Sequence, residues 1–154
     1  MASRNIEDLT TKMQELYRQF AFRMGVAGLA FKTTCTARTS AEQAALYAQG
    51  RSPLKLVNDL REVAGMPAIT QKENKKVTWT TKSKHIIDDT NPKSRAFDIV
   101  LIENGKMHWD IKTDVNKSQV GDYEEAASIG EAVGLRAGAR FKTPDYPHFE
   151  DPNS

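Results

Sequence analysis

One acidic residue stands in a segment that should be buried. Residues 96–102 read A-F-D-I-V-L-I, a short run in which both alternating faces are apolar. Such a run is typical of a central strand that is covered on both sides. Because a carboxylate buried without a partner costs several kcal/mol, Asp98 must be neutralised, paired with a cation or bound to a metal ion.

Two of the three histidines are candidate partners for Asp98. His85 follows V-T-W-T-T in the tripeptide S-K-H, and His148 lies in D-Y-P-H-F-E near the end of the sequence. Two imidazoles and one carboxylate, with a fourth position open, are a ligand set of catalytic zinc. His85, Asp98 and His148 would together supply such a set for one Zn2+ ion. Spacing alone leaves an alternative, in which Asp98 pairs with Arg95 or Lys84 and both histidines have ordinary roles.

Composition narrows the class of protein. The 154 residues are enough for one domain with its own core, so we expect residues 1–154 to form a single domain. The single cysteine, Cys35, excludes an internal disulfide framework and a cysteine-rich zinc site. A net charge of +2 gives no reason to expect nucleic acid as a partner, and we expect a monomer.

The sequence shows no signal for a membrane. No apolar run approaches the length of a membrane span, and the start, MASRNIEDL, lacks the basic-then-apolar pattern of a signal peptide. We therefore expect no stable membrane insertion and synthesis in the cytoplasm. Action outside the cell would then require another route of export.

Helical patterns dominate the first half. Apolar residues recur at helical spacing over 5–24, with Asn5 as the expected N-cap. T-S-A-E-Q-A-A-L-Y-A-Q-G predicts a second helix, with a capping box of Ser40 and Gln43 and a stop at Gly50. A third helix is predicted to begin with proline at its first position. Its expected apolar side consists of Leu56, Val57, Leu60 and Val63.

Strand patterns dominate the second half. We expect strands at 29–35, at 76–81 (K-V-T-W-T-T) and at 96–102. Asn104-Gly105 is a strong two-residue hairpin signal and leads into M-H-W-D-I-K at 107–112.

A last helix and short strands complete the pattern. Asp122 and Glu125 are expected to cap a helix that Gly134 ends, and short strands then lead to P-H-F-E. Helices followed by a mostly antiparallel sheet predict an α+β fold, with N-terminal helices packed on the sheet that carries the metal site.

The motifs around these residues resemble a family of zinc peptidases. The family contains D-alanyl-D-alanine carboxypeptidases and L-alanyl-D-glutamate endopeptidases that act on bacterial peptidoglycan, many of them bacteriophage endolysins. Its first motif, S-x-H-x-x-G-x-A-x-D, is matched by Ser83, His85, Ala96 and Asp98. Its last motif, D-x-P-H-F-E, is matched by Asp145, Pro147, His148, Phe149 and Glu150. An arginine before E-Q-x-x-L-Y-x-Q-G-R is matched by Arg38 and residues 42–51.

The resemblance covers about residues 35–150 and leaves the helix at 5–24 outside, and the chain departs from the motifs in two places. Twelve residues separate His85 from Asp98, where the motif has six, and the motif's glycine is missing. Asp88 or Asp89 is therefore an alternative ligand, although Asp98 keeps the A-x-D context. The insertion at 86–95 is interpreted as a longer surface loop or as a lip beside the cleft. In addition, G-A-R-F at 138–141 replaces the usual Gly-Gly-x-Trp.

The resemblance implies a role for each matched residue. His85, Asp98 and His148 would hold one Zn2+ ion, and Asp145 would be the general base. Arg38 would hold a substrate carbonyl or carboxylate, and Ser83 would bind substrate or shape the strand end.

The resemblance also implies a biological role. An aspartate at 145 favours an endopeptidase for the L-alanyl-D-glutamate bond of peptidoglycan, in a phage endolysin that lyses the host. Such a lysin would be made in the host cytoplasm and reach the wall through a membrane pore made by another protein. The alternatives are a D-alanyl-D-alanine carboxypeptidase and a zinc-bearing binding module without turnover.

Overall fold

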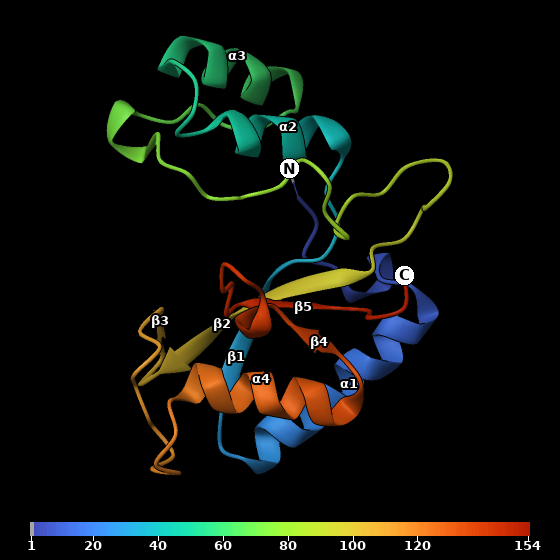
Figure 1. Ribbon diagram of the computed structural model, residues 1–154, viewed down its shortest axis with the longest axis vertical. Coiled ribbons are helices and arrows are strands. Elements are labelled where there is room, and N and C mark those ends of the chain that lie inside the picture. Colours follow the sequence, from blue (N-terminus) through green and yellow to red (C-terminus); the bar gives the residue numbers. More distant parts are fainter. Residues whose placement is uncertain (1) are drawn as a thin grey trace.

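An antiparallel sheet forms the centre of the computed structural model, which describes residues 2–154 (Figure 1). The strand order is β1-β2-β5-β4, and β3 pairs with β2 beyond the stretch that pairs with β5. The strands are β1 (Ala30–Cys35), β2 (Ala96–Glu103), β3 (Lys106–His108), β4 (Arg136–Ala137) and β5 (His148–Glu150). The fold is α+β, as predicted from the order of the patterns.

The main core lies between the sheet and two helices. Helices α1 (Thr11–Val26) and α4 (Asp122–Val133) contact each other and lie together on one side of the sheet (Figure 1). Three buried aromatic rings join these layers, with ring centroids 4.8 Å apart for Phe20 and Phe149 and 5.5 Å apart for Phe97 and Phe149. No helix of the described residues is long and apolar enough to cross a membrane.

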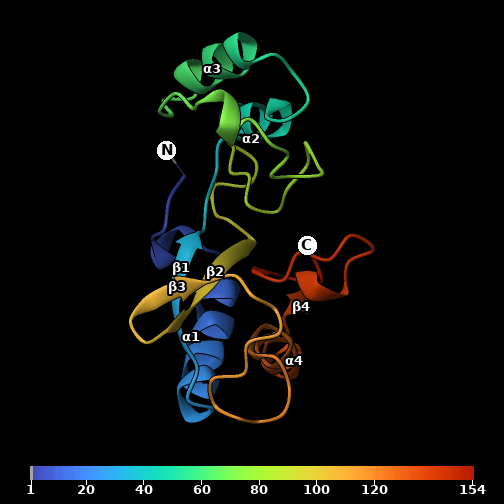
Figure 2. The same cartoon turned by 90° about the vertical axis from the view of Figure 1, so that its left-hand side faces the viewer.

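Two other helices form a lobe of their own. Helices α2 (Ser40–Ala48) and α3 (Leu54–Val63) pack against each other at one end of the molecule, away from α1 and α4 (Figures 1 and 2). Among the described residues, the main hydrophobic core includes none from α2 or α3. Of the predicted apolar side of α3, Val57 is buried, whereas Leu56 is 49% and Val63 81% exposed.

The N-terminal helix begins later than its pattern predicted. Asn5 caps a short 3-10 helix, η1 (Ile6–Asp8), and Thr10 then caps α1 by accepting a hydrogen bond from the backbone of Met13 at 3.1 Å. Leu9 is extended between the two helices and bridges to Ser94. The backbone pairing with residue 94 therefore interrupts a run that is helical by apolar spacing alone.

Two predicted caps were wrong in detail. The capping box of α2 uses Thr39 and Glu42, one residue before the predicted pair, with bonds of 3.1 and 2.9 Å. For α4 the N-cap is Gly121, and the Asp122 carboxylate instead accepts a hydrogen bond from the Val115 backbone at 3.0 Å. A carboxylate that anchors the preceding loop is no longer free to cap its own helix.

The strand predicted at 76–81 is also wrong. The segment is irregular, and Val77 and Trp79 are 54% and 60% exposed. The side-chain amide of Gln43, which is 1% exposed, donates to the Thr80 carbonyl at 2.8 Å and to the Thr78 hydroxyl at 3.3 Å. In a sheet, the Thr80 carbonyl would accept a hydrogen bond from a neighbouring strand. Here the buried Gln43 side chain donates that hydrogen bond instead.

Glycine positions confirm the other turns. Asn104 and Gly105 have φ values of 51° and 76°, the left-handed backbone of the predicted hairpin turn, although β3 is shorter than the predicted 107–112. Gly50 (φ 79°) follows α2, and Gly134 (φ 105°) ends α4 as expected.

Candidate metal centre

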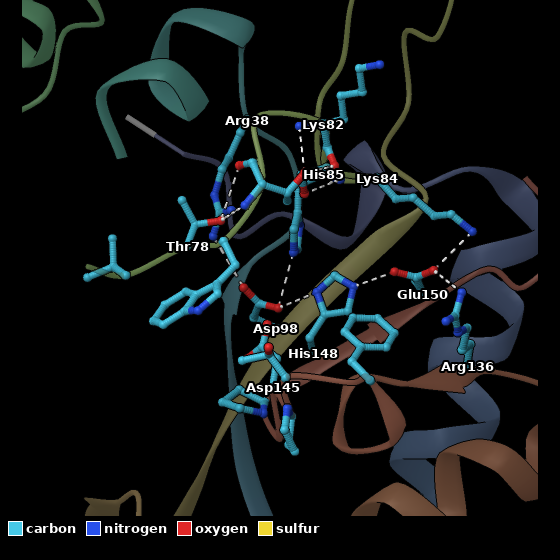
Figure 3. Close-up of a pocket in the computed structure, with 18 of the residues that line it drawn as sticks. Arg38, Thr78, Lys82, Lys84, His85, Asp98, Arg136, Asp145, His148 and Glu150 are labelled. Carbon is cyan, nitrogen blue, oxygen red and sulfur yellow. Dashed lines mark hydrogen bonds and ion pairs between the residues drawn. The ribbon is translucent and has the colours of Figure 1, made fainter. Parts of the chain in front are cut away.

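The three residues predicted as metal ligands meet at one carboxylate. Asp98 Oδ1 lies 3.1 Å from His85 Nε2 and 3.0 Å from His148 Nδ1 (Figure 3). The other oxygen, Oδ2, lies 3.3 Å from Nη2 of Arg38. The Asp98 side chain is 17% exposed, so the strand carboxylate opens onto a cleft rather than into the core. Neither Arg95 nor Lys84, the alternative partners, pairs with it.

The register of the sheet brings these residues together. Asp98 on β2 lies directly opposite His148 on β5 and, on its other side, opposite Cys35 on β1. His85 precedes β2, where the backbone of Arg38 donates to the His85 carbonyl at 2.8 Å. Strand pairing thus brings His148 to Asp98, and the backbone contact with Arg38 brings the turn that carries His85 to the same place.

Each histidine has its second ring nitrogen bound to an acceptor. His85 Nδ1 lies 2.8 Å from the carbonyl oxygen of Thr36, and His148 Nε2 lies 2.8 Å from the Glu150 carboxylate. A carbonyl or carboxylate oxygen can only accept, so these nitrogens carry the protons. In the neutral rings, the lone pairs are then on His85 Nε2 and His148 Nδ1, the atoms that face Asp98. Such outer acceptors are the usual partners of histidines that bind metals.

This arrangement fits a divalent metal ion. Two lone pairs directed at one carboxylate oxygen repel it unless a cation lies among the three groups or the rings are protonated. Zn2+ takes imidazole nitrogen and carboxylate oxygen as ligands and satisfies all three groups at once. Two overlapping sets of ligand atoms lie within 4.8 Å of one another: Cys35, His85 and Asp98, and Asp98, Asp145 and His148. The Cys35 sulfur lies 3.7 Å from His85 Nδ1, on the side that faces Thr36 rather than Asp98.

The pKa values of the site also indicate that Asp98 requires positive charge beside it. Burial opposes a charge on His85, but the adjacent Asp98 outweighs it and raises the pKa of His85 to about 10. Burial would likewise raise the pKa of Asp98, yet the two histidines hold it well below its usual value. The site therefore retains positive charge beside Asp98 even when protons alone supply it.

Glu150 binds the outer ring nitrogen of His148. The last motif contains this residue, but the sequence predicted no role for it. It shares a face of β5 with His148 because the two are two residues apart on a strand. Its second oxygen lies 3.1 Å from Nζ of Lys84 and 3.8 Å from Arg136 (Figure 3). Although burial alone would raise the pKa of Glu150, hydrogen bonds from His148 and Lys84 lower it. Its position in the last motif was the available signal, whereas the Thr36 carbonyl left none in the sequence.

Asp145 lies beside the candidate ligands without a fixed partner. Its side chain is exposed and lines the cleft, and no described residue donates a hydrogen bond to its carboxylate. Although Asp145 is exposed to solvent, the surrounding cleft partly desolvates its carboxylate, and this desolvation, followed by repulsion from Asp98, raises the pKa of Asp145. The backbone around it is held, because the His148 amide donates to the Asp145 carbonyl at 3.1 Å. This is the environment of a carboxylate that can exchange a proton at moderate pH.

Arg38 and Ser83 also line the cleft. Arg38 Nη1 donates to the Gln43 side-chain oxygen at 3.1 Å, and its side chain is 16% exposed. The Ser83 hydroxyl accepts a hydrogen bond from the His85 backbone at 3.2 Å and so helps to shape the turn that carries His85. All six site residues named from the sequence therefore border one cleft of about 740 Å3.

The insertion at 86–95 lies outside this cleft. Asp88 accepts hydrogen bonds from the Thr90 and Asn91 backbones at 2.8 and 2.7 Å, and neither Asp88 nor Asp89 lines the main cleft. The far end of the insertion is tied to the N-terminal segment through Ser94 and Asp8. Ile86, Asp88 and Arg95 of the insertion line a second, smaller depression that shares Lys82, Ser83 and Lys84 with the main cleft. The insertion is therefore a surface loop whose ends lie beside the main cleft, a position that agrees with both interpretations.

Comparisons with known proteins agree with the fold. No model of a known protein family and no curated protein sequence matches this chain. Among solved structures, the chain is similar to the L-Ala D-Glu endopeptidase ChiX of Serratia marcescens, with a TM-score of 0.57 and 15% sequence identity. The match covers 97% of this chain and 87% of that chain. At this identity the similarity establishes a shared fold over nearly the whole length.

Proposed function

We propose that this protein is a zinc-dependent endopeptidase that cleaves the L-alanyl-D-glutamate bond of peptidoglycan stem peptides. The observation that carries the proposal is the orientation of two imidazoles. Both have their outer nitrogen bound to an acceptor and direct the inner one at a single oxygen of Asp98. The fold shared with ChiX supports the same substrate class.

His85, Asp98 and His148 would hold the zinc ion. When bound, zinc acidifies a water molecule and polarises the carbonyl of a peptide bond. The contacts to Thr36 and Glu150 hold both imidazole rings in the orientation and tautomer that a metal ion needs. The two histidines would therefore bind zinc without first turning their rings.

Asp145 would move the proton during hydrolysis. Its carboxylate is free of hydrogen bonds from described residues, and it belongs to one group of possible ligand atoms with Asp98 and His148. It can accept a proton from the attacking water and deliver it to the leaving amine. Because its pKa is raised, the Asp145 carboxylate can take up and release a proton at a pH closer to neutral.

Cationic side chains of the cleft suit an anionic substrate. Arg38, Lys82, Arg136 and Lys142 line the same cleft as Asp98. A guanidinium such as that of Arg38 binds carboxylates and developing oxyanions in a fixed geometry. A stem peptide carries carboxylates on its D-glutamate and beyond, so this charge supports the proposed substrate.

The proposed biological role is that of a phage endolysin. The resemblance of the two ligand motifs to endolysins of this peptidase family supports it. In this role the protein is made in the host cytoplasm and reaches the wall through a pore formed by another protein. Its partner is peptidoglycan, and it works as a monomer.

Digestion of purified peptidoglycan tests the reaction. The zinc-loaded protein, a chelator-treated sample and a zinc-restored sample are each incubated with walls of several stem-peptide types. Mass spectrometry should find fragments with a new N-terminal D-glutamate in the first and third samples only. Release of terminal D-alanine would instead identify a carboxypeptidase. An absence of any cleavage across wall types would leave a binding module and contradict the proposal.

A further inference from the structure

The two tryptophans of the chain, Trp79 and Trp109, line the cleft of the metal centre although they come from different loops. Trp79 is 60% and Trp109 59% exposed. Large apolar side chains exposed together at a cleft mark a surface that contacts a ligand. Because the metal centre and its proton carrier account for neither ring, the two tryptophans need an explanation of their own.

The backbone around Trp79 is tied to the active site. The buried Gln43 amide donates to Thr80 and Thr78, the residues on either side of Trp79. The oxygen of the same amide accepts a hydrogen bond from Arg38. The exposed indole is therefore attached to an anchored segment.

The backbone before Trp109 is held from the core. The Tyr123 side chain, which is 1% exposed, donates from its hydroxyl to the His108 carbonyl at 2.7 Å and accepts from the Leu101 backbone at 3.1 Å. Trp109 directly follows β3, so it too starts from a fixed position. Rings on anchored backbones lose little entropy when they bind a ligand.

We propose that Trp79 and Trp109 form a platform for a sugar ring of the glycan strand, so that stem peptides still attached to glycan are the preferred substrate. This inference rests on the proposed function. In peptidoglycan the L-alanine is joined directly to the lactyl group of muramic acid. The lactyl group and one alanine, together about two residue lengths or on the order of 7 Å, therefore separate the sugar from the bond to be cleaved.

The chemistry of the cleft favours a sugar over a peptide side chain. A hexosamine presents a flat C–H face that packs on an indole, while its hydroxyl groups stay in water. The residues that flank the bond are alanine and glutamate, which are too small or too polar to cover two tryptophans. A cleft of about 740 Å3 is in the size range of sites for ligands larger than a dipeptide.

Two matched substrates test the inference. One is a stem peptide that carries its disaccharide, and the other is the same peptide with an acetyl group in place of the sugar. We expect the wild-type protein to cleave the first with a kcat/KM about tenfold higher or more, the effect of a good aromatic contact. Trp79→Ala and Trp109→Ala should each reduce this ratio, and Trp→Phe variants should retain part of it. Phe22→Ala, which removes a ring that is 73% exposed on α1, should leave the ratio unchanged.

Intrinsic fluorescence provides a second readout, since the chain has only these two tryptophans. In an Asp145→Asn background, in which turnover should be slowed by roughly 100-fold or more, the disaccharide-peptide should change the emission saturably and more strongly than the acetylated peptide. Trp79→Phe and Trp109→Phe variants then report each remaining ring separately.

The outcomes separate this inference from the proposed function. If the wild-type protein cleaves both substrates equally, or if the tryptophan variants lose activity on both equally, the endopeptidase stands and the sugar platform is wrong. If neither substrate is cleaved, the proposed function is wrong. The fluorescence titration then still decides the platform, because no saturable change with the disaccharide-peptide overturns it.

Discussion

At the scale of single residues, the site depends on which atoms of each side chain are already engaged. Thr36 and Glu150 bind the outer nitrogens of the two histidines and leave the inner ones for Asp98. Asp145, in contrast, has a carboxylate without a donor among the described residues. This difference separates groups that would hold a metal from a group that would carry a proton.

Asp145→Asn should abolish most hydrolysis without disturbing the metal. The amide is nearly isosteric and no proposed ligand is removed, so zinc content and thermal melting should stay close to wild type. Activity on peptidoglycan should fall by roughly 100-fold or more, because positioned proton transfer is lost. The matched control is Asp89→Asn, an exposed acid outside the main cleft, which should keep full activity. Near-normal hydrolysis by Asp145→Asn would disprove the role of general base.

The metal-free protein should lose stability as the pH rises from about 6.5 to about 10. The pKa of His85 is raised from 6.5 to about 10, because Asp98 outweighs the burial that opposes its charge. A raised folded-state pKa stabilises the protonated form, so this contribution is complete below the unfolded-state pKa and lost as the pH passes the folded-state value. Thermal melting of chelator-treated protein across this range measures the effect, and His85→Gln should flatten the profile.

Zinc binding should release the same proton. Because the ligand must be neutral, zinc affinity should rise with pH, and calorimetry in buffers of different ionisation enthalpy should detect proton release. His85→Ala should weaken zinc binding, whereas Asp88→Ala should not. If His85→Ala kept full zinc affinity and Asp88→Ala lost it, the proposed ligand set would be wrong and Asp88 in the insertion would be a ligand.

At the scale of elements, the loop after β4 folds back closely on the strand that carries His148. The Asp145 backbone donates to the Gly138 carbonyl at 2.8 Å. A side-chain carbon at position 138 would lie 2.8 Å from the Cβ of His148 and would collide with the Asp145 carbonyl. The missing side chain at Gly138 therefore allows the backbones of Asp145 and His148 to pack closely against this loop.

Gly138→Ala should lower activity by displacing these two residues together. Because the contact is with backbone, the loop must shift, and we expect at least a tenfold loss of kcat/KM, with weaker zinc binding. Gly25→Ala, at a helical position with nothing within 4 Å, is the matched control. It should leave activity unchanged and stabilise the protein by about 0.5–1 kcal/mol. Full activity in Gly138→Ala would show that the loop tolerates the shift.

At the scale of the whole molecule, strand β5 separates the core from the cleft. Phe149 is fully buried and stacks on Phe97, whereas His148 and Glu150 belong to the lining of the cleft. Successive residues of a strand point to opposite faces, so one short strand both closes the core and completes the site. The lobe of α2 and α3 contributes through Gln43, which holds Arg38 from outside the main core.

Phe149→Ala should destabilise the whole domain. Removing this ring leaves a cavity among Phe20, Phe97 and Gly130, at a cost of about 3–5 kcal/mol. Urea unfolding of metal-free protein measures the change. Phe22→Ala removes the same ring from an exposed position and should shift the free energy of unfolding by less than about 0.5 kcal/mol. Equal effects of the two substitutions would contradict the assignment of the core.

Local patterns in the sequence were sufficient for features that depend on neighbouring residues. The buried strand around Asp98, the hairpin at Asn104-Gly105 and the stop at Gly134 all follow from short-range periodicity and backbone preference. The motifs also identified His85 and His148 as the partners to examine, and the structure brings both to Asp98.

Tertiary structure alone decided the features that depend on distant partners. Residues 76–81 alternate like a strand, but the Gln43 amide binds their backbone and no strand of the described residues pairs with them. The run at 5–24 is helical by spacing, but pairing of Leu9 with Ser94 delays the helix. His148 faces Asp98 because of the register between β2 and β5, and His85 faces the same oxygen because its backbone pairs with Arg38. Register is a contact between segments that are far apart in sequence, and no local preference encodes it.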